Sequence, residues 1–161
     1  MDPHVTDDVS EKDILEFAID IERQAVKLYS AAAETTTDPK ARGLLKGLAA
    51  EEVGHEKRLL DLLRKATEDS QLSTQPQPST IQAYKDIVSG DPLPPNPTVE
   101  QIAKFGIERE KATMDLYLIF SHLLAAGAFS ELLEKLAQEE SRHVDRFEEL
   151  ISNEAGLGKE G

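Results

Sequence analysis

The stretch LAAEEVGHEKRLLDLL, residues 48–63, has the apolar repeat of a helix, but two polar residues stand inside that repeat. Residues spaced by three and four positions share one face of a helix. This face reads Leu45, Leu48, Glu52, His55, Leu59 and Leu62. A carboxylate in a protein core costs several kcal/mol unless it is paired or bound to a metal. Glu52 and His55 therefore need compensating partners from elsewhere in the chain.

The same periodicity and the usual capping residues predict four helices in an all-α chain. Ser10 begins the first helix as part of a capping box. Asp38 followed by Pro39 is a favourable start for the second helix, and Thr98 with Gln101 forms a capping box for the third. The predicted helices cover about residues 10–36, 38–66, 98–124 and 127–152.

Residues 67–97 form the one long polar segment between the predicted helices. This segment holds six of the eight prolines, which predicts a linker with room for one short helix. Its length allows a full crossover along a bundle, as one class of four-helix bundles has. We therefore expect a single domain, residues 1–161, folded as a four-helix bundle with a long connection between its second and third helices.

An internal repeat relates the two halves of the chain. Tyr29 and Tyr117 are 88 positions apart, and the same separation relates Glu22 to Glu110, Glu52 to Glu140 and His55 to His143. At this shift roughly 15 of the 50 positions from Ile14 to Leu63 are identical, more than unrelated helices usually share. The repeat predicts a duplicated helical hairpin.

The four glutamates are spaced so that they fall at one height in such a bundle. The first turn is centred near Thr37, with Glu22 15 residues before it and Glu52 15 residues after it. In an antiparallel hairpin both lie about 22 Å from the turn, because a helix rises about 1.5 Å per residue. Glu110 and Glu140 have the same relation to the second turn. We therefore expect four glutamates and two histidines in one layer.

The donor atoms of this layer suit a pair of metal ions. Nitrogen and oxygen ligands favour iron or manganese and also accept zinc. Four carboxylates carry a charge of −4, which two divalent cations would neutralise. A glutamate from each of two helices and a Glu-x-x-His from each of the other two is the ligand pattern of dinuclear carboxylate bundles. Small residues one turn from Glu22 and Glu110, among them Ala18, Gly106 and Thr113, are expected to leave space beside the carboxylates.

The segments AIDIERQAVKLY, LAAEEVGHEKRLL, GIEREKATMDLY and LAQEESRHVDRF resemble the ferritin-like superfamily and, more narrowly, the rubrerythrin-type di-iron domain. The resemblance covers about residues 10–152. It implies a non-haem centre of two iron ions, with manganese or zinc as possible substitutes. It implies the metal ligands Glu22, Glu52, His55, Glu110, Glu140 and His143, with Glu52 and Glu140 as bridging catalytic carboxylates. It also implies that Tyr29 and Tyr117 hydrogen-bond ligand carboxylates.

The resemblance implies an oxidoreductase that reduces hydrogen peroxide or oxidises Fe(II) with O2 or peroxide. Two departures from rubrerythrins matter. The chain has no cysteine for a rubredoxin iron, so an external electron donor is expected, and Thr113 stands where rubrerythrins have a further glutamate. The remaining set of ligands is similar to that of a bacterioferritin-type ferroxidase centre. The alternative function is a non-catalytic protein for metal binding or storage.

Composition sets further expectations. A net charge of −13, from 18 basic and 31 acidic residues, disfavours nucleic acid and anionic membranes as partners. No signal-peptide pattern or apolar run of membrane-spanning length is present, which favours a cytoplasmic protein. The resemblance suggests a homodimer. We interpret Glu51 and Glu139 as solvated or partner-facing, and Arg58 and Arg146 as members of surface ion pairs.

Overall fold

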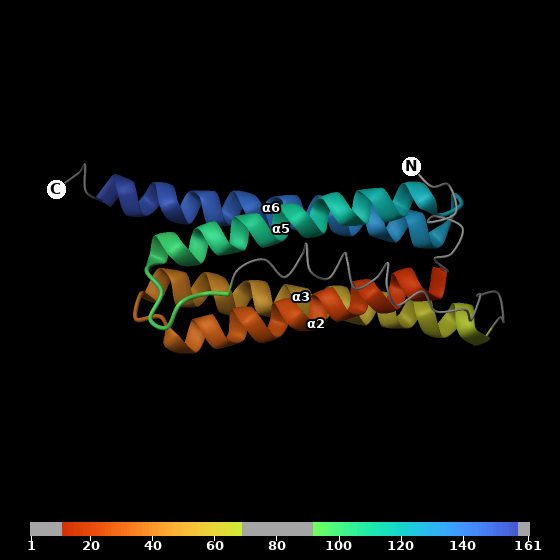
Figure 1. Ribbon diagram of the computed structural model, residues 1–161, viewed down its shortest axis with the longest axis horizontal. Coiled ribbons are helices and arrows are strands. Elements are labelled where there is room, and N and C mark those ends of the chain that lie inside the picture. Colours follow the sequence, from red (N-terminus) through yellow and green to blue (C-terminus); the bar gives the residue numbers. More distant parts are fainter. Residues whose placement is uncertain (1–10, 69–91, 158–161) are drawn as a thin grey trace.

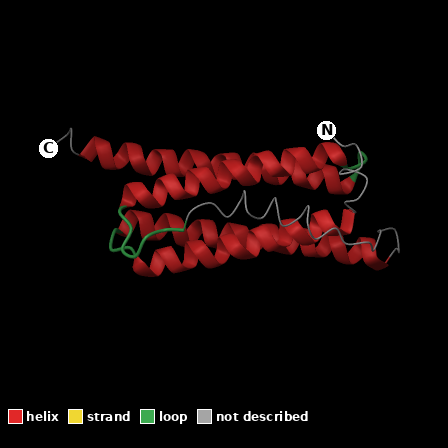
Figure 2. Ribbon diagram, viewed as in Figure 1, coloured by secondary structure: helices red, strands yellow, loops and turns green. Residues whose placement is uncertain are grey.

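The computed structural model describes residues 11–68 and 92–157, and within these ranges the secondary structure consists of helices joined by short turns (Figure 2). The helices are α2 (Glu11–Thr35), α3 (Pro39–Glu68), α5 (Val99–Leu123) and α6 (Ala128–Leu157). The predicted all-α class is confirmed.

The helices form a four-helix bundle made of two antiparallel hairpins (Figure 1). Helix α2 packs along α3 and α5 packs along α6, while α3 with α6 and α2 with α5 form the seams between hairpins. Helix α3 ends and α5 begins at opposite ends of the bundle (Figure 1). This placement of the two helix ends is the one predicted for a ferritin-like bundle with a long connection between its second and third helices.

Two helix starts follow the predicted capping chemistry. The Thr98 hydroxyl accepts a hydrogen bond from the Gln101 amide at 3.1 Å, and the Gln101 side chain accepts one from the Thr98 amide at 2.9 Å. This reciprocal pair satisfies two amides that would otherwise lack partners at the start of α5. The Asp38 carboxylate accepts from the Ala41 amide at 2.8 Å at the start of α3. The predicted cap at Ser10 lies outside the described residues.

Helix α6 continues to Leu157, beyond the predicted end near residue 152. The extra residues include no proline, and their first glycine is Gly156, so nothing in the local sequence stops the helix earlier. Helix α3 likewise runs two residues past the predicted end at Ala66. The greater part of the predicted linker, including any short helix in it, lies outside the described residues.

The core consists of two apolar clusters, one toward each end of the bundle. The first cluster includes Phe17, Leu59, Phe120 and Leu133, and Tyr117 belongs to it. The second cluster contains Tyr29, Leu45, Leu48, Ile102 and Phe147. The buried polar side chains at the middle of the four helices lie between these clusters. Within the described part of the chain, no helix is both long enough and apolar enough to cross a bilayer.

Candidate metal centre

The six predicted ligands are buried together at the middle of the bundle. Their exposed fractions are 4% or less, in a layer contributed by all four helices. Helix α2 supplies Glu22, α5 supplies Glu110, α3 supplies Glu52 and His55, and α6 supplies Glu140 and His143. The equal spacing from the two turns, read from the sequence, therefore brings these residues to one level. Their role as ligands stays a prediction.

The layer contains two overlapping groups of donor atoms, each with its atoms within 4.8 Å of one another. One group is Glu22, Glu52, His55 and Glu140, and the other is Glu52, Glu110, Glu140 and His143. Glu52 and Glu140 belong to both groups, whereas the other residues belong to one each. This arrangement is compatible with a dinuclear site in which the two shared carboxylates lie between two metal positions.

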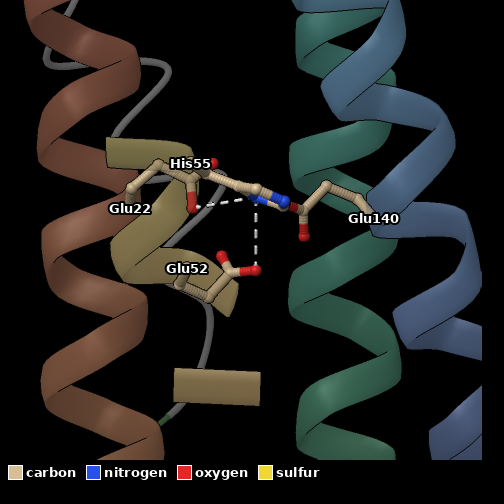
Figure 3. Close-up of side chains that lie close together, drawn as sticks. All are labelled: Glu22, Glu52, His55 and Glu140. Atoms are coloured by element: carbon tan, nitrogen blue, oxygen red, sulfur yellow. Dashed lines mark ion pairs between the residues drawn. The ribbon is translucent and has the colours of Figure 1, made fainter. Parts of the chain in front are cut away.

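The first group gathers around one nitrogen of His55 (Figure 3). His55 Nδ1 lies 2.9 Å from Glu140 Oε1. It is also 3.5 Å from Glu52 Oε1 and 3.6 Å from Glu22 Oε2. Three carboxylates from three helices therefore point toward a single imidazole nitrogen.

The second group repeats this pattern around His143. Its Nδ1 lies 3.0 Å from Glu52 Oε1 and 3.3 Å from Glu140 Oε2. Glu110 Oε1 is 3.7 Å from the same nitrogen. The rings of His55 and His143 are stacked, with centroids 5.7 Å apart and planes inclined by 7°. The duplicated hairpins thus produce two similar half-sites that face each other.

Several donor atoms in the layer are buried without a hydrogen-bond partner. They are Glu22 Oε2, Glu52 Oε1, both carboxylate oxygens of Glu140, and Nδ1 of His55 and of His143. Buried polar atoms in proteins are nearly always hydrogen-bonded, and leaving one unpaired is costly. Apart from Arg109 Nη1, the atoms without a hydrogen bond belong to residues of the two donor groups, where the histidine nitrogens lie 2.9–3.7 Å from the carboxylate oxygens. The donor set therefore fits bound cations, which would satisfy these oxygens and nitrogens together.

Burial and mutual repulsion control the protonation of the layer. Burial raises the pKa of Glu52 and Glu140 well above the usual value, and the neighbouring carboxylates raise both further. Burial opposes protonation of His55 and His143, but their carboxylate neighbours raise the pKa of both imidazoles. Without cations the layer therefore holds protons, which metal ions would displace.

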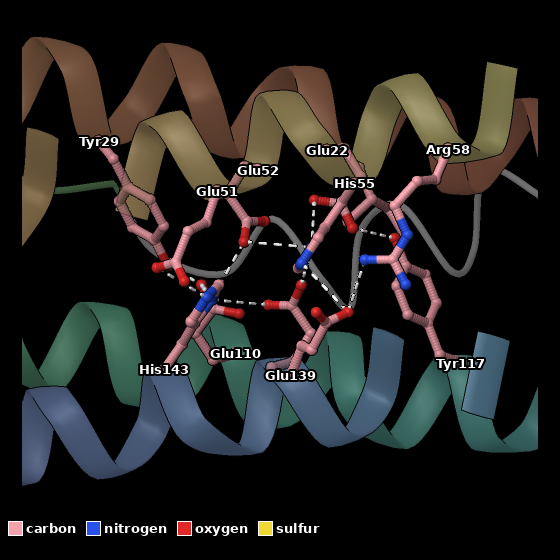
Figure 4. A network of polar contacts seen from close by, with 12 residues as sticks. Glu22, Tyr29, Glu51, Glu52, His55, Arg58, Glu110, Tyr117, Glu139 and His143 are labelled. Carbon is pink, nitrogen blue, oxygen red and sulfur yellow. Dashed lines mark hydrogen bonds and ion pairs between the residues drawn. The ribbon is translucent and has the colours of Figure 1, made fainter. Parts of the chain in front are cut away.

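Both predicted tyrosines contact a predicted ligand carboxylate of the opposite hairpin (Figure 4). The Tyr29 hydroxyl donates to Glu110 Oε1 at 2.5 Å, and the Tyr117 hydroxyl donates to Glu22 Oε1 at 2.7 Å. Burial raises the pKa of both phenols well above their usual value, and the carboxylate charges add to this effect. The phenols therefore stay protonated and hold one oxygen of each carboxylate.

The space expected beside Glu110 is not open at Gly106. A Cβ atom on Gly106 would lie 2.3 Å from the ring of Phe147. The expectation that small neighbours leave room for the carboxylate was therefore wrong at this position, because an aromatic ring from α6 fills the room. The Phe147 ring in turn lies 5.8 Å from the Tyr29 ring, centroid to centroid. The missing side chain at Gly106 thus gives the Phe147 ring the space in which it packs against Tyr29, the residue that contacts Glu110.

Two ion pairs at the seam between α3 and α6 lie nearer to the polar layer than the sequence indicated (Figure 4). Arg58 Nη1 donates to Glu139 Oε2 at 2.8 Å, and Arg146 pairs with Glu51. They are ion pairs at the surface, as interpreted, but each crosses between hairpins. The 88-residue repeat relates Glu51 to Glu139 and Arg58 to Arg146. The repeat could therefore have indicated that the two glutamates and the two arginines form equivalent pairs.

Sequence reasoning missed Arg109, a buried cation next to Glu110. Its exposed fraction is 3%, and its Nη2 donates to the Ile21 carbonyl at 3.0 Å. Its Nη1 is buried without a partner. The Arg109 side chain therefore connects α5, at the position next to Glu110, to the backbone of α2 at the position next to Glu22. The available signal was a broken repeat, because the equivalent position in the first hairpin is Ile21.

The Rubrerythrin family model matches residues 13–91, which include Glu22, Glu52 and His55. No curated protein and no solved structure matches the chain. The matched range covers the first hairpin, and the second hairpin contains the repeat of its key residues.

Proposed function

We propose that this chain, a ferritin-like protein of the rubrerythrin type, is a non-haem di-iron oxidoreductase that uses hydrogen peroxide or O2. The observation that carries the proposal is the convergence of unpartnered buried oxygen and nitrogen atoms in the layer. Such atoms are costly in a core that serves packing alone, and they match the ligand pattern of dinuclear carboxylate bundles.

Each residue has a role in this proposal. His55 and His143 would each hold one metal through Nδ1, the ring nitrogen that faces the carboxylates. Glu52 and Glu140 would be shared by two metal ions because each belongs to both donor groups. Glu22 and Glu110 would complete one metal position each, and a tyrosine hydroxyl donates to one oxygen of each carboxylate. This arrangement leaves Glu22 Oε2 free to bind a cation.

A pair of iron ions held by these residues would supply one-electron redox chemistry toward peroxide, O2 or further Fe(II). The chain's own groups keep this chemistry inside the bundle. The apolar clusters on both sides of the layer exclude water. The tyrosines keep their protons and orient the terminal carboxylates. With no cysteine in the chain, reduction of peroxide to two water molecules requires two electrons from an external donor as well as two protons.

The test is an anaerobic titration of the metal-free protein with Fe(II), followed by peroxide in one sample and O2 in another. The proposal expects a near-ultraviolet charge-transfer band that saturates at two irons per chain. The oxidant that gives the faster reaction identifies the activity. Glu148→Gln, an exposed glutamate on α6, is the control and should titrate as the wild type does. Binding of two metal ions without oxidation would instead indicate a binding or storage protein.

A further inference from the structure

Adjacent glutamates on α3 bracket a histidine of the other hairpin (Figure 4). Glu52 Oε1 lies 3.0 Å from His143 Nδ1, on the side of the ring that faces the layer. Glu51 Oε2 lies 3.5 Å from Nε2 of the same ring, on its outer side. One Glu-Glu pair thus provides a carboxylate for each nitrogen of this imidazole.

Helix α6 repeats this arrangement toward His55. Glu140 Oε1 lies 2.9 Å from His55 Nδ1, and Glu139 Oε2 lies 3.6 Å from His55 Nε2. In both halves the outer carboxylate comes from the hairpin that does not carry the histidine. The sequence pattern Glu-Glu-x-x-His-x-x-Arg occurs at residues 51–58 and again at residues 139–146.

The arginine that ends each pattern holds the outer glutamate of the other. Arg58 Nη1 donates to Glu139 Oε2, the same oxygen that faces His55 Nε2. Arg146 contacts both oxygens of Glu51, one of which faces His143 Nε2. Each outer carboxylate therefore lies between an arginine and a ring nitrogen. The Glu51 side chain is 42% exposed and that of Glu139 is 24% exposed, so the arginines restrict groups that water would otherwise leave free.

We propose that Glu139 with Arg58, and Glu51 with Arg146, are positioning pairs that fix the metal-binding tautomers of His55 and His143. A carboxylate at Nε2 favours a proton on that nitrogen and leaves the Nδ1 lone pair directed into the layer. Since the outer carboxylate and the histidine belong to different hairpins, each hairpin sets the tautomer of the histidine on the other. The inference rests on the proposed metal-binding role of the layer, but it concerns residues that belong to neither donor group.

The pairs differ from an ordinary surface ion pair, which this chain also contains. Arg23 Nε donates to Glu56 Oε1 at 2.8 Å, between α2 and α3 of a single hairpin. The structure gives this pair no contact with either histidine, and exposed ion pairs of this kind contribute little. Arg23→Met is therefore a matched control, because it removes an arginine from a similar pair that does not reach the layer.

The experiment measures Zn(II) binding to the full chain for wild type, Glu139→Ala, Glu139→Gln, Arg58→Met and Arg23→Met. We expect Glu139→Ala to weaken one of two Zn(II) sites by about 10- to 100-fold, as is typical when the outer partner of a ligand histidine is lost. Arg58→Met should weaken the same site, with little further effect when Glu139 is already alanine. Arg23→Met should bind Zn(II) as the wild type does.

A second readout separates positioning from a general loss of structure. In the Zn(II)-loaded protein, long-range ¹H–¹⁵N spectra distinguish metal-bound from protonated ring nitrogens. The wild type should show metal at Nδ1 and a proton at Nε2 of both rings, and Glu139→Ala should change the His55 signals alone. The mirror variant Glu51→Ala should change those of His143.

Three outcomes bear on the inference in different ways. Unchanged Zn(II) affinity and unchanged His55 signals in both Glu139 variants would overturn it. Equal losses in Arg58→Met and Arg23→Met would also overturn it, because the effect would then be one of charge alone. If the wild type binds no paired metal ions, the proposed function fails instead. Glu139→Gln keeps the size of the side chain and an acceptor oxygen, so it serves if the alanine variant does not fold.

Discussion

Tyr29 on α2 donates a 2.5 Å hydrogen bond to Glu110 on α5, and both side chains are buried. Tyr117 returns the same contact from α5 to Glu22 on α2 at 2.7 Å. The two hydrogen bonds therefore cross the seam between hairpins in opposite directions. Each tyrosine belongs to a different apolar cluster, so each cluster is joined to the polar layer by one phenol.

Removing one phenol should destabilise the metal-free protein. Tyr29→Phe keeps the buried ring but leaves Glu110 Oε1 without its donor. Hydrogen bonds to charged groups contribute about 1.5–3 kcal/mol, so we expect a loss of this order in the free energy of unfolding. Urea denaturation with a chelator present measures it. A variant as stable as the wild type would show that the Tyr29–Glu110 contact does not stabilise the fold.

Gly106→Ala should destabilise the bundle, although alanine is the better helix former. The added Cβ would meet the Phe147 ring, which is fully buried. Overpacking of this kind costs about 1–3 kcal/mol. Gly47→Ala on α3 is the matched control, because a Cβ there meets nothing within 4 Å, and it should stabilise by about 0.5–1 kcal/mol. Thermal unfolding compares the two, and stabilisation by both substitutions would contradict the packing argument.

The shared and unshared carboxylates should differ in metal stoichiometry. Glu52→Gln removes a carboxylate from both donor groups, whereas Glu22→Gln removes one from a single group. We expect Glu52→Gln to lose paired binding and Glu22→Gln to weaken one of two metal ions. Equilibrium dialysis with metal analysis measures both. If Glu52→Gln still binds two ions with wild-type affinity, the assignment of Glu52 as a bridge is wrong.

The metal-free protein should become less stable as the pH rises. Burial and like charges raise the pKa of Glu52 and Glu140 well above 4.5, and carboxylate contacts outweigh burial to raise that of His143. A group whose pKa is raised by folding stabilises the fold below its unfolded pKa, and this contribution is lost as the pH rises through the folded pKa.

The pH dependence should reverse for metal binding, because cations replace the protons of the same groups. Urea denaturation with a chelator, from about pH 5 to about pH 8, should show a falling free energy of unfolding. Over the same range the affinity for Zn(II) should rise. Burial opposes ionisation of Glu110, but its hydrogen-bonded neighbours lower its pKa, so its contribution has the opposite sign and is lost only in acid. Stability that rises with pH in the metal-free protein would contradict the prediction.

The helices and the level of the polar layer were predictable from the sequence because both depend on local periodicity. The apolar steps of three and four fix which residues share a helix face. The distance of Glu22 and Glu52 from one short turn fixes their relative height, because rise per residue is constant. The repeat then places Glu110 and Glu140 at the same level. The end of α6 was predicted too early, since helix ends depend weakly on local sequence.

The contacts between hairpins required the tertiary structure. The sequence places Tyr29, Glu51 and Arg58 on particular helix faces, but not opposite particular side chains of the other hairpin. That choice depends on how α3 docks on α6 and α2 on α5, which is decided by side-chain packing across these two seams. The sequence alone therefore determined which residues could share a layer. The docking of the hairpins decided that Tyr29 donates to Glu110 and that Arg58 holds Glu139 beside His55.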